Sequence, residues 1–333
     1  MTPFHRAAQR LLWAQTALND PLFKLESASS DASFRSYWRG YSEGRTWIVM
    51  DAPPDKEDTG PWLAMARRLT DAGLHAPEIR AVDEENGFVL MSDLGVRLFL
   101  PELNERTADE LYGQALDALL QMQTRLPSQD LPAYDEQRLT AEMELMPTWF
   151  FERHLGFTPS CEQWDVIELA FRKLLDSAGR QTHAFVHRDY HSRNLLISES
   201  GQPGILDFQD AVHGPITYDL VSLLRDCYIA WPDDRVEAWV EAYRQRAETA
   251  GLATGSPAQL LQAFDLMGLP RHITPLGIFC RLYYRDGKSG YLGELPLVWE
   301  YTRRIGRKYP ETAPLIELIE HAIGTRDITL PSA

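Results

Sequence analysis

Three short apolar segments separated by polar residues constrain this chain more than any other part of its sequence. They lie at 184–186, 195–197 and 204–206, and each is short enough to be a buried β-strand. The first leads into residues 187–194, which read His-Arg-Asp-Tyr-His-Ser-Arg-Asn, and Asp-Phe-Gln follows the third at 207–209. This spacing predicts a strand, a loop and then a hairpin, with polar side chains held at the strand ends.

The polar groups in this region occur in the order that phosphoryl transfer from ATP requires. Asp189 is placed to accept the proton of an acceptor hydroxyl, and Asn194 and Asp207 supply the oxygen ligands that Mg²⁺ prefers. His191 and Arg193 either stabilise the transferring phosphate or face outward as ordinary loop residues. The alternative interpretation, two surface turns that carry acids, is disfavoured because turns rarely lie between so many apolar residues.

Composition restricts the class of protein. The length of 333 residues favours two domains, and a hydrophobic content of 44% suffices for a large core. The net charge of −15 disfavours partners such as nucleic acid or an anionic membrane. The three cysteines, Cys161, Cys227 and Cys280, show no disulfide framework, and no signal peptide or membrane-length apolar run is evident. We therefore expect a cytoplasmic enzyme, able to act as a monomer on small molecules.

The pattern of the chain changes from β-rich to helical near residues 92–95. Before this point we expect a helix at 4–18, a hairpin of 34–39 with 46–50, a helix from Pro61 to near Gly73, and a hairpin of 79–82 with 88–91. Helical patterns follow at 107–125, 136–154, 160–178, 217–228, 235–249, 256–268 and about 291–322. This predicts an α+β, bilobal protein-kinase-like fold, with a β-rich nucleotide-binding lobe at 1–92 and a helical lobe at 93–333.

A nucleotide would bind in the crevice between the two lobes, with adenine against the hinge at 88–93. The candidate residues have small side chains, a positive charge or a place at the hinge: Ser29, Ser30, Ala32, Ser33, Arg35, Met91 and Asp93. Small side chains before the first hairpin let backbone N–H groups approach phosphates, although an ordinary polar turn has the same composition.

The third strand lacks the lysine that protein kinases use to hold the α- and β-phosphates. It reads Ile-Val-Met-Asp at 48–51, and the helix after Pro61 contains no glutamate to pair with such a lysine. Arg35, Arg39 or Lys56 is then expected to supply the positive charge, and Arg35 is preferred because it adjoins the loop of small residues.

Three charged residues follow on the helix expected at 217–228. Asp219 lies at its start, where it is expected to cap the helix or to brace the catalytic loop (residues 187–194), and capping is preferred to direct chemistry. Arg225 and Asp226 are expected to form a surface ion pair, unless the helix presents them to the substrate.

The segments 187–194 and 207–210 resemble the aminoglycoside phosphotransferase and choline kinase superfamily, whose members share the protein-kinase-like fold. The segments 29–35, 48–54, 276–282 and 285–288 resemble one subgroup, the anomeric N-acetylmuramate and N-acetylglucosamine kinases of bacterial cell-wall recycling. The similarity extends from the serine-rich loop to about Tyr301, and the lysine-free third strand is part of the subgroup's pattern.

The resemblance implies transfer of the ATP γ-phosphate to an anomeric hydroxyl, giving sugar 1-phosphates for peptidoglycan recycling toward UDP-sugars. N-acetylmuramate carries a lactyl carboxylate, which a basic group should meet. The densest basic cluster of the helical lobe consists of Arg271, His272, Arg281, Arg285 and Lys288. The candidate substrate contacts are Glu142, Glu144, Asp210, Arg225 and Arg281.

Two other functions remain open at this point. The acceptor could be an aminoglycoside or another small molecule, because the net negative charge leaves room for an acidic acceptor groove. A nucleotide-binding pseudokinase is a non-enzymatic alternative, motivated by the missing strand lysine. The presence of Asp189, Asn194 and Asp207 together argues against a pseudokinase.

Overall fold

The computed structural model describes residues 3–30 and 34–331. Packing divides the chain into two compact units. Unit 1 comprises Met1–Phe99 with Asn194–Asp210, and unit 2 comprises Leu100–Arg193 with Ala211–Ala333. The sequence alone assigned residues 194–210 to the domain at 93–333. They pack with unit 1 because the Ile197 amide donates to the Arg97 carbonyl (2.8 Å) and the Ile205 amide donates to the His75 carbonyl (2.9 Å).

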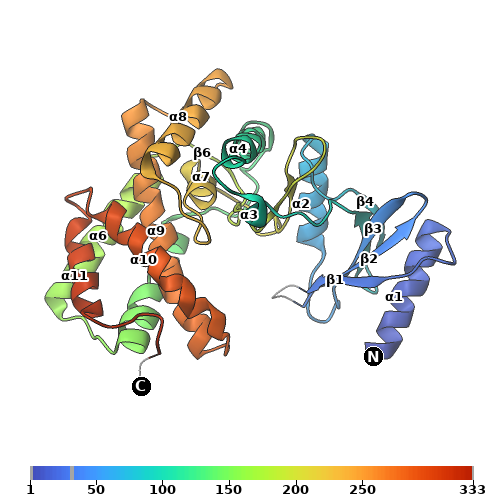
Figure 1. Cartoon of the computed structure of the whole chain (residues 1–333), viewed down its shortest axis with the longest axis horizontal. Coiled ribbons are helices and arrows are strands. Elements are labelled where there is room, and N and C mark those ends of the chain that lie inside the picture. Colours follow the sequence, from blue (N-terminus) through green and yellow to red (C-terminus); the bar gives the residue numbers. More distant parts are fainter. Residues whose placement is uncertain (1–2, 31–33, 332–333) are drawn as a thin grey trace. The chain divides into compact units, whose positions relative to one another are not determined.

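Unit 1 is built around a five-stranded antiparallel sheet with the strand order β1-β2-β3-β5-β4 (Figure 1). Its strands are β1 (Glu26–Ser30), β2 (Ser36–Ser42), β3 (Arg45–Asp51), β4 (Ile79–Asp83) and β5 (Phe88–Ser92). Helices α1 (Pro3–Leu18) and α2 (Gly60–Asp71) complete it, together with the short hairpin of β7 (Leu195–Leu196) and β8 (Gly204–Ile205). The two predicted hairpins and both predicted helices of this region are therefore present.

Helix α1 is attached to the sheet by apolar packing and by two ion pairs. Its buried residues Ala14 and Leu18 join a core cluster with Trp47, Val49 and Leu90 of the sheet. The Asp51 carboxylate, at the end of β3, accepts from Arg6 and Arg10 of α1, each at 2.7 Å. Asp51 is buried, and both of its carboxylate oxygens are paired with these arginines. The end of the lysine-free strand thus serves to anchor α1.

Helix α2 begins and ends where the sequence predicts. Pro61 occupies its first turn, where the missing amide hydrogen costs nothing. Gly73, just beyond the helix, has a φ of +79°, which only glycine adopts without strain. The apolar residues at helical spacing are buried: Trp62, Leu63, Met65, Ala66 and Leu69.

Unit 2 is mainly helical. Its helices are α4 (Ala108–Arg125), α5 (Glu136–Met143), the π-helix η1 (Met146–Leu155), α6 (Cys161–Gly179), α7 (Thr217–Leu224), α8 (Asp233–Thr249), α9 (Pro257–Tyr284), the 3₁₀-helix η2 (Ser289–Glu294), α10 (Leu295–Gly306) and α11 (Ala313–Ile323). Strands β6 (His183–Val186) and β9 (Val212–Pro215) form an antiparallel pair, and α3 (Phe99–Glu102) lies at the boundary of the two units.

Helix α9 differs most from the prediction. The sequence predicts a helix over 256–268, yet the helix continues to Tyr284 through Pro270 and Pro275, residues that normally break a helix. Packing on several sides, against α7, α10 and η1, holds it in place. Gly277 lies so close to η1 that an added Cβ would be 2.3 Å from the Leu145 carbonyl carbon. Tertiary contact therefore overrides the local helix-breaking signal.

Two other predicted helices are interrupted. The segment 136–154 changes from α5 to the π-helix η1 near Leu145, and the segment 291–322 is divided among η2, α10 and α11. Strand β9 was not predicted from the sequence, since its Gly and Pro residues are untypical of a strand.

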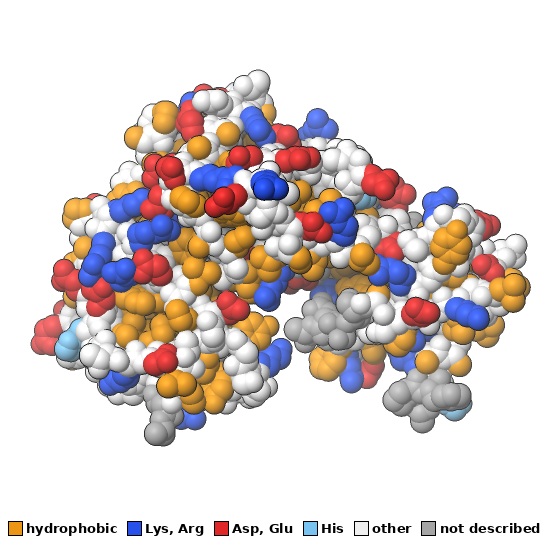
Figure 2. Space-filling model, in the orientation of Figure 1, with side chains coloured by type: hydrophobic (Ala, Val, Ile, Leu, Met, Phe, Trp, Pro, Cys, Tyr) orange, Lys and Arg blue, Asp and Glu red, His pale blue; other side chains and the backbone are white. Residues whose placement is uncertain are grey.

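The described surface carries no large area of one charge on the face shown in Figure 2, where acidic and basic side chains are interspersed. Among the helices of the described residues, none combines the length and the apolar character that crossing a membrane requires.

Candidate active site

The β7–β8 hairpin of unit 1 positions the two predicted metal ligands. The strands pair Leu195 with Ile205 and Leu196 with Gly204. The Leu206 amide donates to the Asn194 carbonyl at 3.0 Å, so the pairing extends one residue beyond the named strands. Asn194 and Asp207 therefore lie at the same open end of the hairpin.

Asp207 has an unusual backbone conformation, with a φ of +60°. Few residues other than glycine adopt this conformation without strain, and such strain is concentrated at functional sites. The next residue, Phe208, is buried and packs on Trp62 of α2 with the ring centroids 5.3 Å apart. Gln209 donates its amide to the Asp207 carboxylate at 2.8 Å. The hairpin end is thus held by packing on one side and by a hydrogen bond on the other.

The cations of unit 1 show which arginine lies near the predicted metal ligands. Arg35 Nη2 is 3.9 Å from Asp207 Oδ1. Arg39 is instead bound to Asp93 through two hydrogen bonds of 2.6 and 2.9 Å, and Lys56 lies 4.8 Å from the centroid of the Phe34 ring. Arg35 is therefore better placed than Arg39 or Lys56 to supply the positive charge expected near Asp207.

The other nucleotide-binding candidates are only partly described. Ser29 and Ser30 end strand β1, whereas Ala32 and Ser33 lie outside the described residues. Met91 is buried in β5 between Ile48 and Ile79 of the neighbouring strands. Their nucleotide contacts stay predictions.

Asp93 follows β5 and has protein partners. Its carboxylate accepts from Arg39 and from the Gly95 amide. Burial by itself raises its pKa, but these donors outweigh burial and hold the pKa below its ordinary value. A nucleotide that contacts the Asp93 side chain would have to share its carboxylate with Arg39 and the Gly95 amide.

In unit 2, Asp219 holds the start of the catalytic loop. Its carboxylate accepts from the backbone amides of His187 (2.6 Å) and Arg188 (3.0 Å). Of the two roles predicted for Asp219, bracing the catalytic loop is confirmed and capping the helix is wrong, because Asp219 lies inside α7 and its oxygens accept from the loop. Arg188 has a φ of +78°, so the carboxylate stabilises a strained turn directly before Asp189. Burial raises the pKa of Asp219 to about 7, and the two amide donors oppose that effect.

The expected surface pair of Arg225 and Asp226 is also wrong, since both residues are buried and have separate partners. Asp226 Oδ2 accepts from the amide (3.0 Å) and the hydroxyl (2.5 Å) of Ser192, in the catalytic loop. Arg225 donates to Asp265 of α9 at 2.5 Å. A buried charged side chain needs a polar partner, and the partners of Arg225 and Asp226 lie on two different segments of the chain. The Arg225 side chain is fully buried, and its contact with substrate stays a prediction.

The flanking residues of the loop are braced by aromatic rings. The His191 ring lies 5.7 Å from the Tyr228 ring, and the Arg193 guanidinium lies 3.5 Å from the centroid of that ring. Tyr190 is buried and donates to the Ala115 carbonyl at 2.8 Å. Their catalytic roles stay predictions, and Tyr228 is an additional neighbour that the sequence did not indicate.

The predicted acceptor residues have different environments. Glu142 accepts from Arg188 at 2.8 Å and from the Tyr134 hydroxyl, so it supports the residue before Asp189. Glu144 and Asp210 are exposed, and Arg281 is partly buried on α9. Direct contact of these residues with a substrate stays a prediction.

The predicted basic cluster does not form a single group of free charges. Burial lowers the pKa of His272 to about 3, so this residue is neutral and stacks on Tyr301. Arg285 is exposed and paired with Asp286. Arg271 donates to the Tyr218 hydroxyl at 3.0 Å and remains partly exposed.

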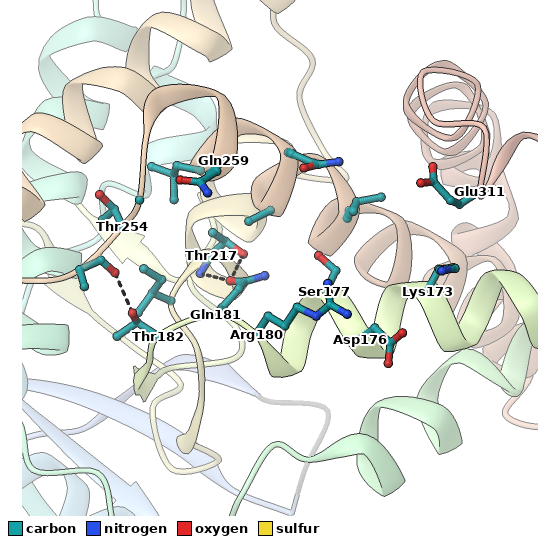
Figure 3. A pocket seen from close by; sticks show the side chains of 17 residues that line it. Lys173, Asp176, Ser177, Arg180, Gln181, Thr182, Thr217, Thr254, Gln259 and Glu311 are labelled. Atoms are coloured by element: carbon teal, nitrogen blue, oxygen red, sulfur yellow. Dashed lines mark hydrogen bonds between the residues drawn. The ribbon is translucent and has the colours of Figure 1, made fainter.

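A separate pocket of about 540 Å³ lies in unit 2 at the start of β6 and α7 (Figure 3). Gln181 accepts from the amide (3.3 Å) and the hydroxyl (2.6 Å) of Thr217 at its wall. None of the predicted site residues lines this pocket.

The donor set at the hairpin fits magnesium. Asn194 and Asp207 offer an amide oxygen and a carboxylate, the hard ligands that Mg²⁺ takes in small number, with phosphate and water completing its coordination. Among the described residues, no group of three or more His, Cys, Asp or Glu side chains forms an all-protein metal site.

Comparison with known proteins agrees with the phosphoryl-transfer chemistry that these residues suggest. Residues 24–258, more than half of the chain, match the model of the phosphotransferase enzyme family. The chain belongs to this family. An N-acetylmuramate/N-acetylglucosamine kinase of Pseudomonas putida is 42% identical over 94% of this chain and 96% of its own. A kinase of the same name from Pseudomonas aeruginosa is 45% identical over 90% of this chain and 88% of its own.

Solved structures confirm the predicted fold of this phosphotransferase. An ADP-bound aminoglycoside phosphotransferase matches with a TM-score of 0.60, at 15% identity over 90% of this chain and 98% of its own. A choline/ethanolamine kinase family protein from Mesorhizobium loti matches with a TM-score of 0.61, at 14% identity over 94% and 99%. The chain is thus a kinase with the α+β, protein-kinase-like fold, and the pseudokinase alternative loses its support.

Replacing Asp219 by alanine will destabilise this phosphotransferase and reduce its activity. The change leaves two buried amides, those of His187 and Arg188, without an acceptor, at a cost of about 2–4 kcal/mol in the free energy of unfolding. We expect kcat to fall at least about tenfold, because the turn before Asp189 relaxes. Urea unfolding and initial rates measure the two effects. Asp117→Asn, on the exposed face of α4, is the control. Equal stability of Asp219→Ala and this control would show that Asp219 does not hold the loop in place.

Proposed function

We propose that this chain phosphorylates the anomeric (C1) hydroxyl of N-acetylmuramate and N-acetylglucosamine with ATP and Mg²⁺, giving sugar 1-phosphates. The observation that carries the proposal is the braced loop bearing Asp189, followed by a hairpin that places Asn194 and Asp207 at one end. The relatives named as N-acetylmuramate/N-acetylglucosamine kinases share 42–45% of their residues with this chain over nearly all of it, which supports the choice of sugar.

The proposed chemistry suits a carboxylate as the general base. An anomeric hydroxyl is more acidic than other sugar hydroxyls, because the ring oxygen withdraws electrons from C1. Asp189 accepts its proton late in the transfer, while positioning supplies most of the rate enhancement. Two backbone amides bound to Asp219 and the Ser192 bonds to Asp226 hold this loop in place before substrate arrives.

Residues of unit 1, together with magnesium, would neutralise the negative charge of the phosphates. Asn194 and Asp207 would hold magnesium, which neutralises the phosphate oxygens when bound. Arg35, 3.9 Å from Asp207, adds positive charge in place of the missing strand lysine. The residues Ser29, Ser30, Ala32 and Ser33 would cover the phosphates through backbone amides.

Phosphorus NMR tests the proposal directly. The protein is incubated with Mg-ATP and, in separate samples, N-acetylmuramate, N-acetylglucosamine, kanamycin or homoserine. We expect a new anomeric phosphate signal with both amino sugars, and none after chelation of magnesium with EDTA. Phosphorylation of kanamycin alone would instead assign the chain to aminoglycosides, and ATP binding without turnover of any acceptor would show that it is not a kinase of these sugars.

A further inference from the structure

Arg271 is a cation of unit 2 for which no ion pair with an acidic side chain is found among the described residues. It projects from the middle of α9, where its guanidinium carbon lies 4.8 Å from the centroid of the Tyr218 ring. Nη1 donates to the Tyr218 hydroxyl at 3.0 Å, and Nε is buried with no partner among the described residues. The side chain is therefore held in one place while most of its donors stay available.

Two observations bring Arg271 close to the proposed base. Arg271 and His191, two residues beyond Asp189, line the same small cavity of about 20 Å³. Burial by itself lowers the pKa of Arg271, but electrostatic attraction to Tyr218 and Asp189 outweighs burial and raises it. Arg271 thus lies close to the catalytic loop, and its positive charge interacts with the carboxylate of Asp189.

The other cations of the predicted basic cluster are less suitable. His272 is buried and neutral, and Arg285 is paired with Asp286 at 2.7 Å. Arg281 lies on the same helix ten residues later, which is about 15 Å farther along its axis. Arg225 is fully buried against Asp265. Arg271 alone among these combines partial exposure, a fixed position and proximity to Asp189.

The two proposed acceptor sugars differ in the substituent on the oxygen at C3. N-acetylmuramate carries a lactyl group on the oxygen at C3, which ends in a carboxylate, whereas N-acetylglucosamine has a neutral hydroxyl there. C3 is two ring carbons from C1, so an anomeric hydroxyl at Asp189 keeps the lactyl carboxylate in the neighbourhood of the loop. A guanidinium is the side chain best suited to bind a carboxylate through paired hydrogen bonds.

We propose that Arg271 binds the lactyl carboxylate of N-acetylmuramate and so determines how well the enzyme uses the anionic sugar relative to the neutral one. The assignment rests on the proposed function. Tyr218 orients the guanidinium, and the donors that are not bound to Tyr218 meet the carboxylate. The neutral sugar leaves these donors to water and binds without them.

Steady-state kinetics of Arg271→Met with both sugars tests the assignment. For N-acetylmuramate we expect kcat/KM to fall about 10- to 100-fold, because a charge-assisted bond is lost. Most of the change should appear in KM, since the carboxylate is held equally before and during transfer. For N-acetylglucosamine the change should stay below about threefold. Arg271→Lys should give an intermediate loss. Arg303 is a partly exposed residue of α10 that pairs with Glu300, and Arg303→Met should leave kcat/KM for both sugars unchanged.

A second measurement does not depend on the folding of a variant. The unaltered enzyme is compared on N-acetylmuramate and on its neutral lactyl amide, and we expect the amide to lose a similar factor in kcat/KM. Equal losses for both sugars in Arg271→Met, or equal use of the acid and the amide, would overturn the assignment while leaving the proposed function intact. Failure of the unaltered enzyme to phosphorylate either sugar would overturn the proposed function, and this assignment with it.

Discussion

Asp189→Asn will reduce kcat for both amino sugars by about 10²- to 10⁴-fold, the usual contribution of a positioned general base. The amide has the same shape as the carboxylate but cannot accept the hydroxyl proton. The amides of His187 and Arg188 donate to the Asp219 carboxylate, so the loop should keep its conformation. The phosphorus NMR assay with N-acetylglucosamine measures the loss.

The control for this variant is Asp165→Asn, which changes an exposed carboxylate on α6. It should retain full activity. The KM for ATP and the melting temperature of Asp189→Asn should stay close to those of the unaltered enzyme, which separates loss of chemistry from loss of folding. Activity of Asp189→Asn within a few-fold of the control would exclude Asp189 as the base.

Asp207→Asn will lower the maximal rate by about 10²- to 10³-fold and will shift its dependence on magnesium to higher concentration. The expected size corresponds to removal of one group that stabilises charge at the transferring phosphate. Asparagine is chosen because it tolerates the φ of +60° at this position, whereas alanine would add strain. The change also removes the negative charge that lies 3.9 Å from Arg35.

A magnesium titration at constant ATP concentration measures this effect. Asp71→Asn, an exposed acid at the end of α2 in the same unit, is the matched control and should follow the curve of the unaltered enzyme. An unchanged magnesium midpoint in Asp207→Asn would show that Asp207 does not hold the metal.

Local spacing was sufficient to predict the catalytic segment. The apolar runs around Asp189, Asn194 and Asp207 form β6, β7 and β8, and the hairpin that delivers the last two residues is present. The reason is that a short strand, a loop and a hairpin depend on neighbours in the sequence. The N-terminal hairpins and the helix from Pro61 to Gly73 were predictable for the same reason.

Buried polar residues could not be understood from their neighbours. Asp219 lies in α7 and Asp226 lies just beyond its end, both close to leucines. By local criteria Asp219 is a helix cap or a loop brace, and Asp226 is half of a surface pair. Their partners, His187 and Ser192, lie about thirty residues earlier in the chain and come close only when α7 packs beneath the loop. Helix α9 was misjudged similarly, because packing against α7 and α10 carries it through two prolines.

The sequence by itself therefore indicated the reaction class, since Asp189, Asn194 and Asp207 occur in order at the spacing of a strand, a loop and a hairpin. Only the tertiary structure decided what holds the catalytic loop in place and which charges surround it. A carboxylate is costly to bury without a partner, so the role of Asp219 and Asp226 depends on which amides the fold brings to them. The same holds for Arg271, one of several arginines in the sequence, which lines the same small cavity as His191 of the catalytic loop because of the packing of α9.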